Sequence, residues 1–177
     1  MASILALAGS NSSTSINFKL VKFTTSLISG HELELLNMAN ITLPMFSEDR
    51  EKQLGFPEAL ENLKQKFENA DAVILSVNEH NSGPSAYFKN VLDWLSRANR
   101  NYLENTQVFL MSASPGKRGG LGAKEYVMGS LPRVGGTITA TFSLPSFHAN
   151  FNEEKGIIED SLSKEHAKAL ESFISEL

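Results

Sequence analysis

Short apolar runs alternate with amphipathic stretches along this chain, and the alternation constrains the fold more than any other feature of the sequence. The run 3–8, SILALA, ends at Gly9 and is typical of a strand buried on both faces. The stretch 15–28 carries apolar residues at helical spacing and predicts an amphipathic helix. The same unit recurs, with strands predicted at 3–8, 31–36, 72–77, 107–112 and 137–142 and helices at 15–28, 57–69, 87–95, 121–131 and 162–173. This alternation predicts an α/β fold, a parallel sheet with right-handed crossovers and helices on both faces.

Two stretches and the chain length refine this picture. The stretch 31–36 alternates apolar and acidic residues, which predicts a strand at an edge of the sheet. The stretch 38–57 combines prolines and a glycine with Met45, Phe46 and Phe56, and predicts a long loop pinned by apolar anchors. At 177 residues, the whole chain, 1–177, is expected to form a single domain.

Composition excludes several classes of protein. The 16 Lys and Arg residues against 20 Asp and Glu give a formal charge of -4, which argues against nucleic-acid or anionic-membrane partners. The chain has no cysteine, so thiolate nucleophiles, disulfides and iron–sulfur clusters are excluded and redox chemistry requires a bound cofactor. No metal site is expected, because His31, His148 and His166 have no ligand partner at recognisable spacing. No targeting or membrane-spanning segment is recognisable, so a cytoplasmic location is the expectation.

Three loops are the candidate ligand sites, because ligands of open α/β sheets bind beyond the carboxyl ends of the strands. They follow the first, third and fourth predicted strands, at 9–16, 78–84 and 113–120. The first loop, in the stretch GSNSSTSIN, concentrates hydroxyls and free backbone N–H groups before a helix, an arrangement that binds phosphate. A helix N-cap with surplus serines is the alternative. Neither a P-loop nor a GxGxxG motif is present, so a monophosphate fits better than a triphosphate or a dinucleotide.

The second and third loops have different compositions. The second, NEHNSGP, is polar and turn-forming and precedes a helix that carries Lys89, Asp93 and Trp94. Trp94 is more typical of a core or an interface than of a ligand contact, and Lys89 with Asp93 has the spacing of a helical ion pair. The third loop, SASPGKRGGLG, has enough glycine to bring its backbone close to a flat ligand.

Motifs in the three loops give the chain a family resemblance over nearly its whole length. The first loop has a Gly-Ser start and a later Ser-x-Asn, the second a Glu-x-Asn turn before Lys-Asn-x-x-Asp-Trp, and the third Ser-x-Ser-x-Gly-x-x-Gly-Gly. The matching residues are Gly9, Ser10, Ser15, Asn17, Glu79, Asn81, Lys89, Asn90, Asp93, Trp94, Ser112, Ser114, Gly116, Gly119 and Gly120. The chain therefore resembles the NADPH-dependent FMN reductases, which share a flavodoxin-like fold with the chromate, quinone and azo reductases.

The resemblance implies a fold and an activity. The fold is a flavodoxin-like three-layer sandwich whose five-stranded parallel sheet has the order 2-1-3-4-5. The activity is oxidation of NADPH (or NADH) through bound FMN, with electrons passed to a small-molecule acceptor such as a quinone, an azo compound, a metal oxyanion or another flavin. No catalytic side chain is required, because the cofactor carries the chemistry. A flavodoxin-like electron carrier and a noncatalytic FMN-binding module are the alternatives.

The resemblance also implies which residues bind FMN and how the protein assembles. The first loop is expected to hold the phosphate and the other two to line the ring. The expected contacts are Ser10, Ser12, Ser15, Ile16, Asn17, Glu79, His80, Asn81, Ser82, Ser112, Ser114, Pro115, Gly116 and Gly119. A homodimer or a dimer of dimers is expected, with 38–57 and the helix bearing Tyr87 and Trp94 as candidate surfaces.

The chain departs from the family pattern in two of the loops. Ser12 stands where the family usually has an arginine. Asn78 and His80 stand where the family has the proline and the tyrosine of Pro-Glu-Tyr.

Overall fold

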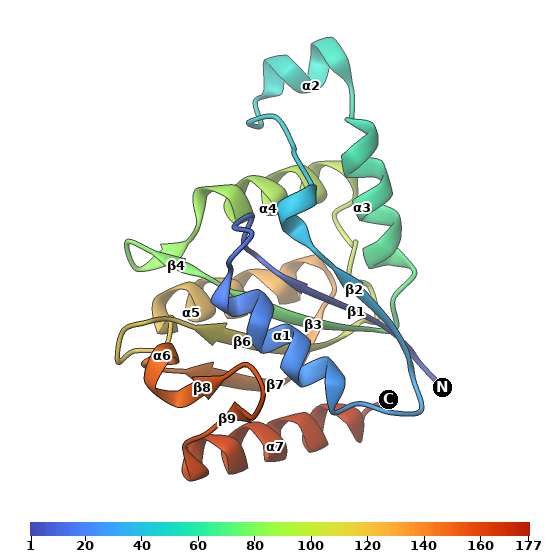
Figure 1. Cartoon of the computed structure of the whole chain (residues 1–177). Helices are drawn as coiled ribbons and strands as arrows, with labels where there is room; N and C mark the ends of the chain where they lie inside the picture. Colours follow the sequence, from blue (N-terminus) through green and yellow to red (C-terminus); the bar gives the residue numbers. More distant parts are fainter.

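A five-stranded parallel sheet forms the centre of the protein, in a computed structural model that describes residues 1–177. In spatial order its strands are β2 (Glu32–Leu36), β1 (Ser3–Ala8), β3 (Ala72–Val77), β6 (Gln107–Ala113) and β7 (Thr137–Leu144) (Figure 1). Counted along the chain these strands have the order 2-1-3-4-5, which confirms the expected flavodoxin-like topology. The strand with alternating acidic residues, β2, is an edge strand as predicted.

Helices cover both faces of the sheet and complete three layers (Figure 1). They are α1 (Ile16–Ser26), α3 (Glu58–Glu68), α4 (Ala86–Ala98), α5 (Leu121–Ser130) and α7 (Asp160–Ile174). Successive side chains of a strand point to opposite faces, so β1 contributes Leu5 and Leu7 to the core beneath α3, α4 and α5. Its Ile4 and Ala6 join the other core, beneath α1 and α7. None of the helices combines the length and the apolar character that crossing a bilayer requires.

The structure adds short elements that the sequence pattern did not reveal. They are η1 (Met38–Asn40), α2 (Glu48–Leu54), β4 (Glu79–His80), β5 (Gly83–Pro84), η2 (Leu131–Val134), α6 (Phe147–Asn150), β8 (Phe151–Asn152) and β9 (Gly156–Ile157). The prediction of a loop throughout 38–57 is therefore wrong. Helix α2 forms because the Ser47 hydroxyl accepts from the Arg50 amide (3.2 Å) and three acidic residues occupy the first turn.

One face of α4 holds the segment 38–46 against the body of the protein. The hydroxyl of Tyr87 donates to two carbonyl oxygens of this segment, each at 2.9 Å. One turn later, the amide of Asn90 donates to the carbonyl oxygen of Pro44 (3.0 Å) and accepts from the backbone N–H of Phe46 (2.8 Å). The helix therefore binds the backbone of the segment by hydrogen bonds from polar side chains that are one turn apart.

Trp94 adds a further hydrogen bond to this segment. It is a core residue, as the apolar residues around it in the sequence predicted. Its indole N–H donates to the carbonyl oxygen of Pro44 at 2.8 Å, and its side chain is 0% exposed. The ring of Phe46 meets it edge to face, with centroids 5.1 Å apart. Arg97 ends the same face with two bonds to Glu51, at 2.9 and 3.1 Å. Trp94 is thus turned toward the segment and not toward a free surface.

A histidine is buried in the core between α1, α7 and the sheet. The Nε2 atom of His166 lies 2.9 Å from the hydroxyl of Thr24, and the rings of Phe23, Phe109 and Phe142 surround the imidazole. Burial lowers the pKa of His166 to about 4, because the charged imidazolium loses its hydration there. The expectation that this histidine is structural agrees with its position.

The buried His166 predicts a loss of stability in acid. The pKa is lower in the folded than in the unfolded protein, so the unfolded state binds more protons between pH 6.5 and pH 4. The histidine's contribution should be complete above pH 6.5, and the free energy of unfolding should fall by about 3 kcal/mol as the pH drops to 4. Urea unfolding at pH 7 and pH 4 measures this change.

His166→Leu is the matched variant, because it fills the site with an apolar side chain that does not titrate. Its free energy of unfolding should decrease less between the two pH values than that of the unsubstituted protein. Equal decreases would contradict the assignment of the pH dependence to His166.

Candidate functional site

The three loops expected to bind a ligand meet at one end of the sheet because Asn17 connects them. Its Oδ1 accepts from the Ser76 hydroxyl (2.7 Å) and from the Ala113 backbone N–H (2.8 Å), and its Nδ2 donates to the Ala113 carbonyl (3.1 Å). The Ser85 hydroxyl adds a bond to the carbonyl of Gly9 (3.2 Å). One hydrogen of the Asn17 amide remains for a ligand, so the contacts of this side chain are chiefly internal.

The first loop presents unpaired donors at the start of α1. Ser15 is the N-cap residue, and its hydroxyl accepts from the Phe18 N–H (3.2 Å). The backbone N–H groups of Asn11, Ser13, Ile16 and Asn17 donate to no protein acceptor. No acidic residue occupies the first turn of the helix. The capping interpretation is therefore correct for Ser15, and the free N–H groups still form a cradle suited to an anion.

Gly9 brings the first loop close to α4. A Cβ atom on this glycine would lie 2.7 Å from the ring of Phe88, which is closer than carbon atoms pack. The serines that follow also order the loop, since the Ser10 hydroxyl accepts from the Ser12 N–H (3.3 Å). The Ser12 hydroxyl, on an exposed residue, lies 3.3 Å from that of Thr14.

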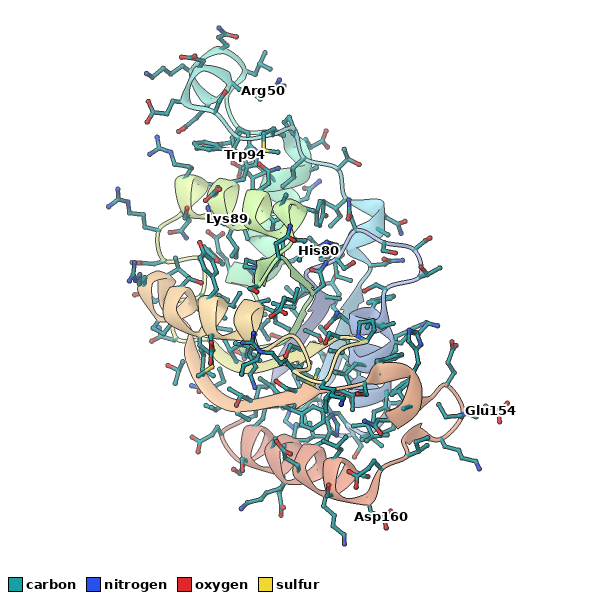
Figure 2. All side chains as sticks on the ribbon, turned by 90° about the vertical axis from the view of Figure 1, so that its left-hand side faces the viewer. Arg50, His80, Lys89, Trp94, Glu154 and Asp160 are labelled. Atoms are coloured by element: carbon teal, nitrogen blue, oxygen red, sulfur yellow. The ribbon has the colours of Figure 1, made fainter.

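The second loop is a tight hairpin made of β4 and β5. Its two central residues, Asn81 and Ser82, have φ values of 52° and 64°, the positive angles of a type I′ turn. His80, Asn81 and Ser82 are exposed, and His80 lies between α4 and α5 in Figure 2. The hairpin thus presents three of the predicted site residues to solvent on a defined backbone.

Glu79 has a structural contact that the sequence did not reveal. Its Oε2 accepts from the backbone N–H of Ala123 (3.1 Å), in the first turn of α5. The N-cap residue of that helix is Gly120, which has no side chain to cap it. A Cβ on Gly122 would lie 2.6 Å from the Ser82 carbonyl oxygen, so glycine there allows the hairpin to dock. The Glu79 carboxylate, which belongs to β4, therefore caps the N-terminus of α5.

The third loop divides into buried and exposed residues. Ser112 is 0% exposed, and its hydroxyl donates to the carbonyl of Gly119 at 2.7 Å. The Ser114 hydroxyl donates to the carbonyl of Gly116 (3.2 Å), while Pro115 and Gly116 are exposed. Ser112 shapes the loop from inside, and the rim from Ser114 to Gly116 is the part available to a ligand.

Asn78 lies in the second loop and is not among the residues expected to contact FMN. It joins β3 to β4, and its Oδ1 is shielded from solvent without any hydrogen-bond donor. No other buried side-chain nitrogen or oxygen atom in the protein lacks a partner. The sequence marks Asn78 only as a departure from the family pattern, which has a proline at this position.

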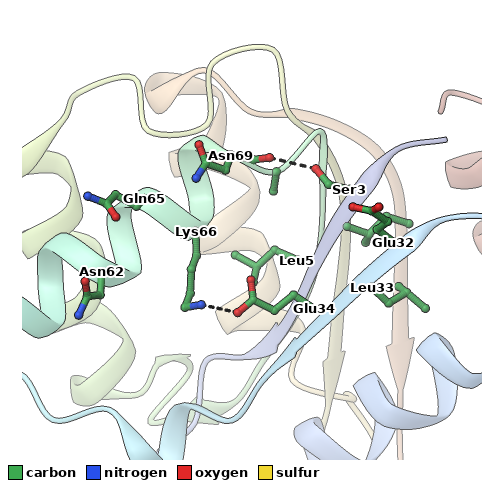
Figure 3. Close-up of a pocket in the computed structure, with 11 residues that line it drawn as sticks. Ser3, Leu5, Glu32, Leu33, Glu34, Asn62, Gln65, Lys66 and Asn69 are labelled. Atoms are coloured by element: carbon green, nitrogen blue, oxygen red, sulfur yellow. Dashed lines mark hydrogen bonds and ion pairs between the residues drawn. The ribbon is translucent and has the colours of Figure 1, made fainter.

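A sizeable groove lies elsewhere, between α3 and the start of β1 and β2. It has a volume of about 650 Å³ and is lined by Lys66, paired with Glu34, and by exposed amides such as that of Asn62 (Figure 3). This groove contains none of the residues of the three loops. No three His, Asp or Glu side chains lie close enough together to hold a metal ion. The loop cluster, with its free donors and orphan acceptor, is the better candidate for a ligand.

Comparison with known proteins identifies the family. The model of the NADPH-dependent FMN reductase family matches residues 2–149. The chain belongs to this family. The remaining residues, 150–177, include β8, β9 and α7, which pack on the same fold. FMN and a reduced nicotinamide nucleotide are the cofactors that membership in the family entails.

Individual relatives agree with the family assignment. An NAD(P)H-dependent FMN reductase of Pseudomonas aeruginosa is 29% identical over 129 residues, which cover 72% of this chain and 68% of the relative. A quinone reductase of Escherichia coli K12 is 30% identical over 118 residues, covering 66% of this chain and 62% of that protein. The chain thus aligns with less than two thirds of the second protein's length.

Solved structures confirm the fold. The flavoenzyme FerB, an NAD(P)H:(acceptor) oxidoreductase of Paracoccus denitrificans, superposes with a TM-score of 0.78 at 24% identity. The superposition covers 99% of this chain and 96% of FerB. The NADH:FMN oxidoreductase EMOB in its apo form gives a TM-score of 0.75 at 18% identity, covering 100% and 90% of the two chains.

The residues of the loop cluster fit FMN in three respects. Free N–H groups before a helix without nearby acids suit a phosphate, and the exposed hairpin, docked on the first turn of α5 that follows the third loop, suits a flat ring. The orphan acceptor on Asn78 suits a ligand that carries hydrogen-bond donors. Which of the expected residues touch the cofactor stays a prediction.

The cap formed by Glu79 predicts a local effect of substitution. Glu79→Ala leaves the Ala123 N–H without its acceptor and removes a negative charge from the start of α5, at a cost of about 1 kcal/mol. Amide hydrogen exchange at Ala123 should become faster by about fivefold. Glu79→Gln keeps an acceptor oxygen in place and should retain most of the protection. Unchanged exchange in Glu79→Ala would show that the contact does not stabilise the helix.

Proposed function

We propose that this protein oxidises NADPH or NADH through noncovalently bound FMN and passes the electrons to a small-molecule acceptor. The observation that carries the proposal is the convergence of three loops around unpaired N–H groups at the start of α1. Family membership and the relatives named above support the reaction type. We also propose a cytoplasmic location, because reduced nicotinamide nucleotides are available there.

The protein's own residues would bind FMN and orient it. Ser10, Ser12 and Ser15, with the N–H groups of Ile16 and Asn17, would hold the phosphate with neutral donors and the positive end of the α1 dipole. No arginine assists, because Ser12 occupies the position where the family usually has one. FMN, when bound, supplies the hydride-accepting and hydride-donating chemistry. The protein therefore needs no side-chain nucleophile or general base.

The second and third loops would line the ring. The hairpin from Glu79 to Ser82 is held by its cap on α5. The third loop turns back after its rim at Gly119, whose φ is 61°. Backbone groups held in this way keep the ring, the nicotinamide and the acceptor in a reactive orientation. The acceptor would be a quinone, as in the Escherichia coli relative, or an azo compound, a metal oxyanion or a free flavin.

FMN titration tests the proposal. Apo-protein added to FMN should quench the flavin fluorescence with a dissociation constant at or below about 1 μM, and the complex should oxidise NADPH or NADH with a quinone acceptor. Riboflavin, which lacks the phosphate, should bind more weakly, because it loses the contacts at the start of α1.

Ser12→Arg is the informative variant. A charge-assisted contact is stronger than a neutral one, so the variant should bind FMN about tenfold more tightly and leave riboflavin unchanged. The absence of quenching would leave a noncatalytic module as the better interpretation. Binding without NAD(P)H oxidation would favour an electron carrier.

We also propose that the protein assembles as a homodimer or a dimer of dimers through the segment 45–56. Met45, Leu54 and Phe56 are 68%, 71% and 38% exposed on this segment, whereas Tyr87 and Trp94 are turned inward. Exposed apolar clusters of this kind support association. Sedimentation at micromolar concentration should show about two or four times the monomer mass of 19.4 kDa. Leu54→Glu should shift the equilibrium to monomer while Leu27→Glu, exposed outside the segment, does not; a single 19.4 kDa species would contradict the proposal.

A further inference from the structure

The orphan oxygen of Asn78 is the starting point of this inference. A buried acceptor without a donor destabilises the protein that contains it, and native structures contain few such atoms. The Oδ1 of Asn78 is the one buried side-chain atom here without a partner. Asn78 lies between β3 and β4, and its side chain caps no helix. The local backbone therefore gives no structural reason for an asparagine at this position.

The position of Asn78 in the sheet indicates which part of a ligand it meets. It follows β3, which lies between β1 and β6 and therefore between the first and the third loop. Side chains two residues apart in an extended chain point to the same side, so the side chain of Asn78 lies on the same side of the sheet as that of Ser76. The Ser76 hydroxyl contacts Asn17, beside the free N–H groups of α1. Asn78 thus lies on the path from the phosphate cradle to the exposed hairpin.

We propose that Asn78 is a positioning residue whose side-chain oxygen accepts a hydrogen bond from a hydroxyl of the ribityl chain of FMN. The proposal rests on the FMN binding proposed above. The ribityl chain is the part of FMN that connects phosphate to ring, and its hydroxyls are hydrogen-bond donors. Bound FMN would therefore supply the donor that Oδ1 lacks in the protein alone.

This assignment gives Asn78 opposite effects on the two states of the protein. Without FMN, the unpaired acceptor is unfavourable, so its removal should stabilise the apo-protein. With FMN, the same acceptor is paired, so its removal should weaken binding. A residue with a purely structural role would change stability in the other direction and would not discriminate between ligands.

The experiment uses three flavins and a variant of similar size. Asn78→Leu removes the acceptor and keeps the branched shape and the number of heavy atoms of the side chain. FMN and riboflavin, which carry the ribityl chain, should bind at least about tenfold more weakly, equivalent to about 1.4 kcal/mol. Lumiflavin, which has the ring without the chain, should bind as it does to the unsubstituted protein. The melting temperature of the apo-protein should rise by a few degrees.

Two further variants make the result decisive. Asn62→Leu, exposed on α3 in the groove of Figure 3, is the control and should leave all three affinities unchanged. Asn78→Ala provides the same comparison of flavins if Asn78→Leu does not fold.

The outcomes separate this inference from the proposed function. Equal weakening of all three flavins, unchanged binding of FMN and riboflavin, or a lower apo melting temperature would overturn the role of Asn78 while the FMN proposal stands. Failure of the unsubstituted protein to bind any flavin would overturn both.

Discussion

A single buried amide, that of Asn17, organises the ligand end of the sheet. Its two polar atoms form three hydrogen bonds, which join the start of α1 to β3 and to the end of β6. In a low-dielectric environment these three bonds fix one arrangement, because any displacement leaves buried polar groups without partners. The free N–H groups of the first loop, the hairpin after β3 and the glycine-rich loop after β6 take their relative positions from this connection.

Most of the fold could be predicted from the sequence, and the reason is physical. Strands such as 72–77 are buried on both faces and therefore have continuous apolar runs, while helices such as 87–95 display one apolar stripe. The hairpins β4–β5 and β8–β9 escaped prediction, because strands of two residues have no periodicity to detect. Helix α2 was missed although Ser47 and the acidic residues after it are a start signal.

The candidate site was predictable as a set of loops but not as a set of side-chain directions. Loop composition indicated phosphate and ring binding, yet Glu79 caps α5 and Ser112 is enclosed by its own loop. A glutamate or a serine in a loop can contact either a ligand or a backbone group. Which of these partners it contacts depends on the direction of its side chain in the folded protein. Asn78 could not be selected from sequence for a related reason, since its distinguishing property is a missing hydrogen bond.

The contacts of α4 with the segment 38–46 have a consequence for how this protein can diverge. Tyr87, Asn90 and Trp94 bind backbone carbonyl and N–H groups of the segment, which do not depend on the side chains there. The side chains of Met38, Leu43 and Phe46 also pack in or against the core, so the freedom to change belongs to the exposed side chains of the segment. Substitutions at exposed positions such as Met45 can accumulate without moving the backbone, so the surface that this segment presents can evolve while the loops around the ligand stay in register.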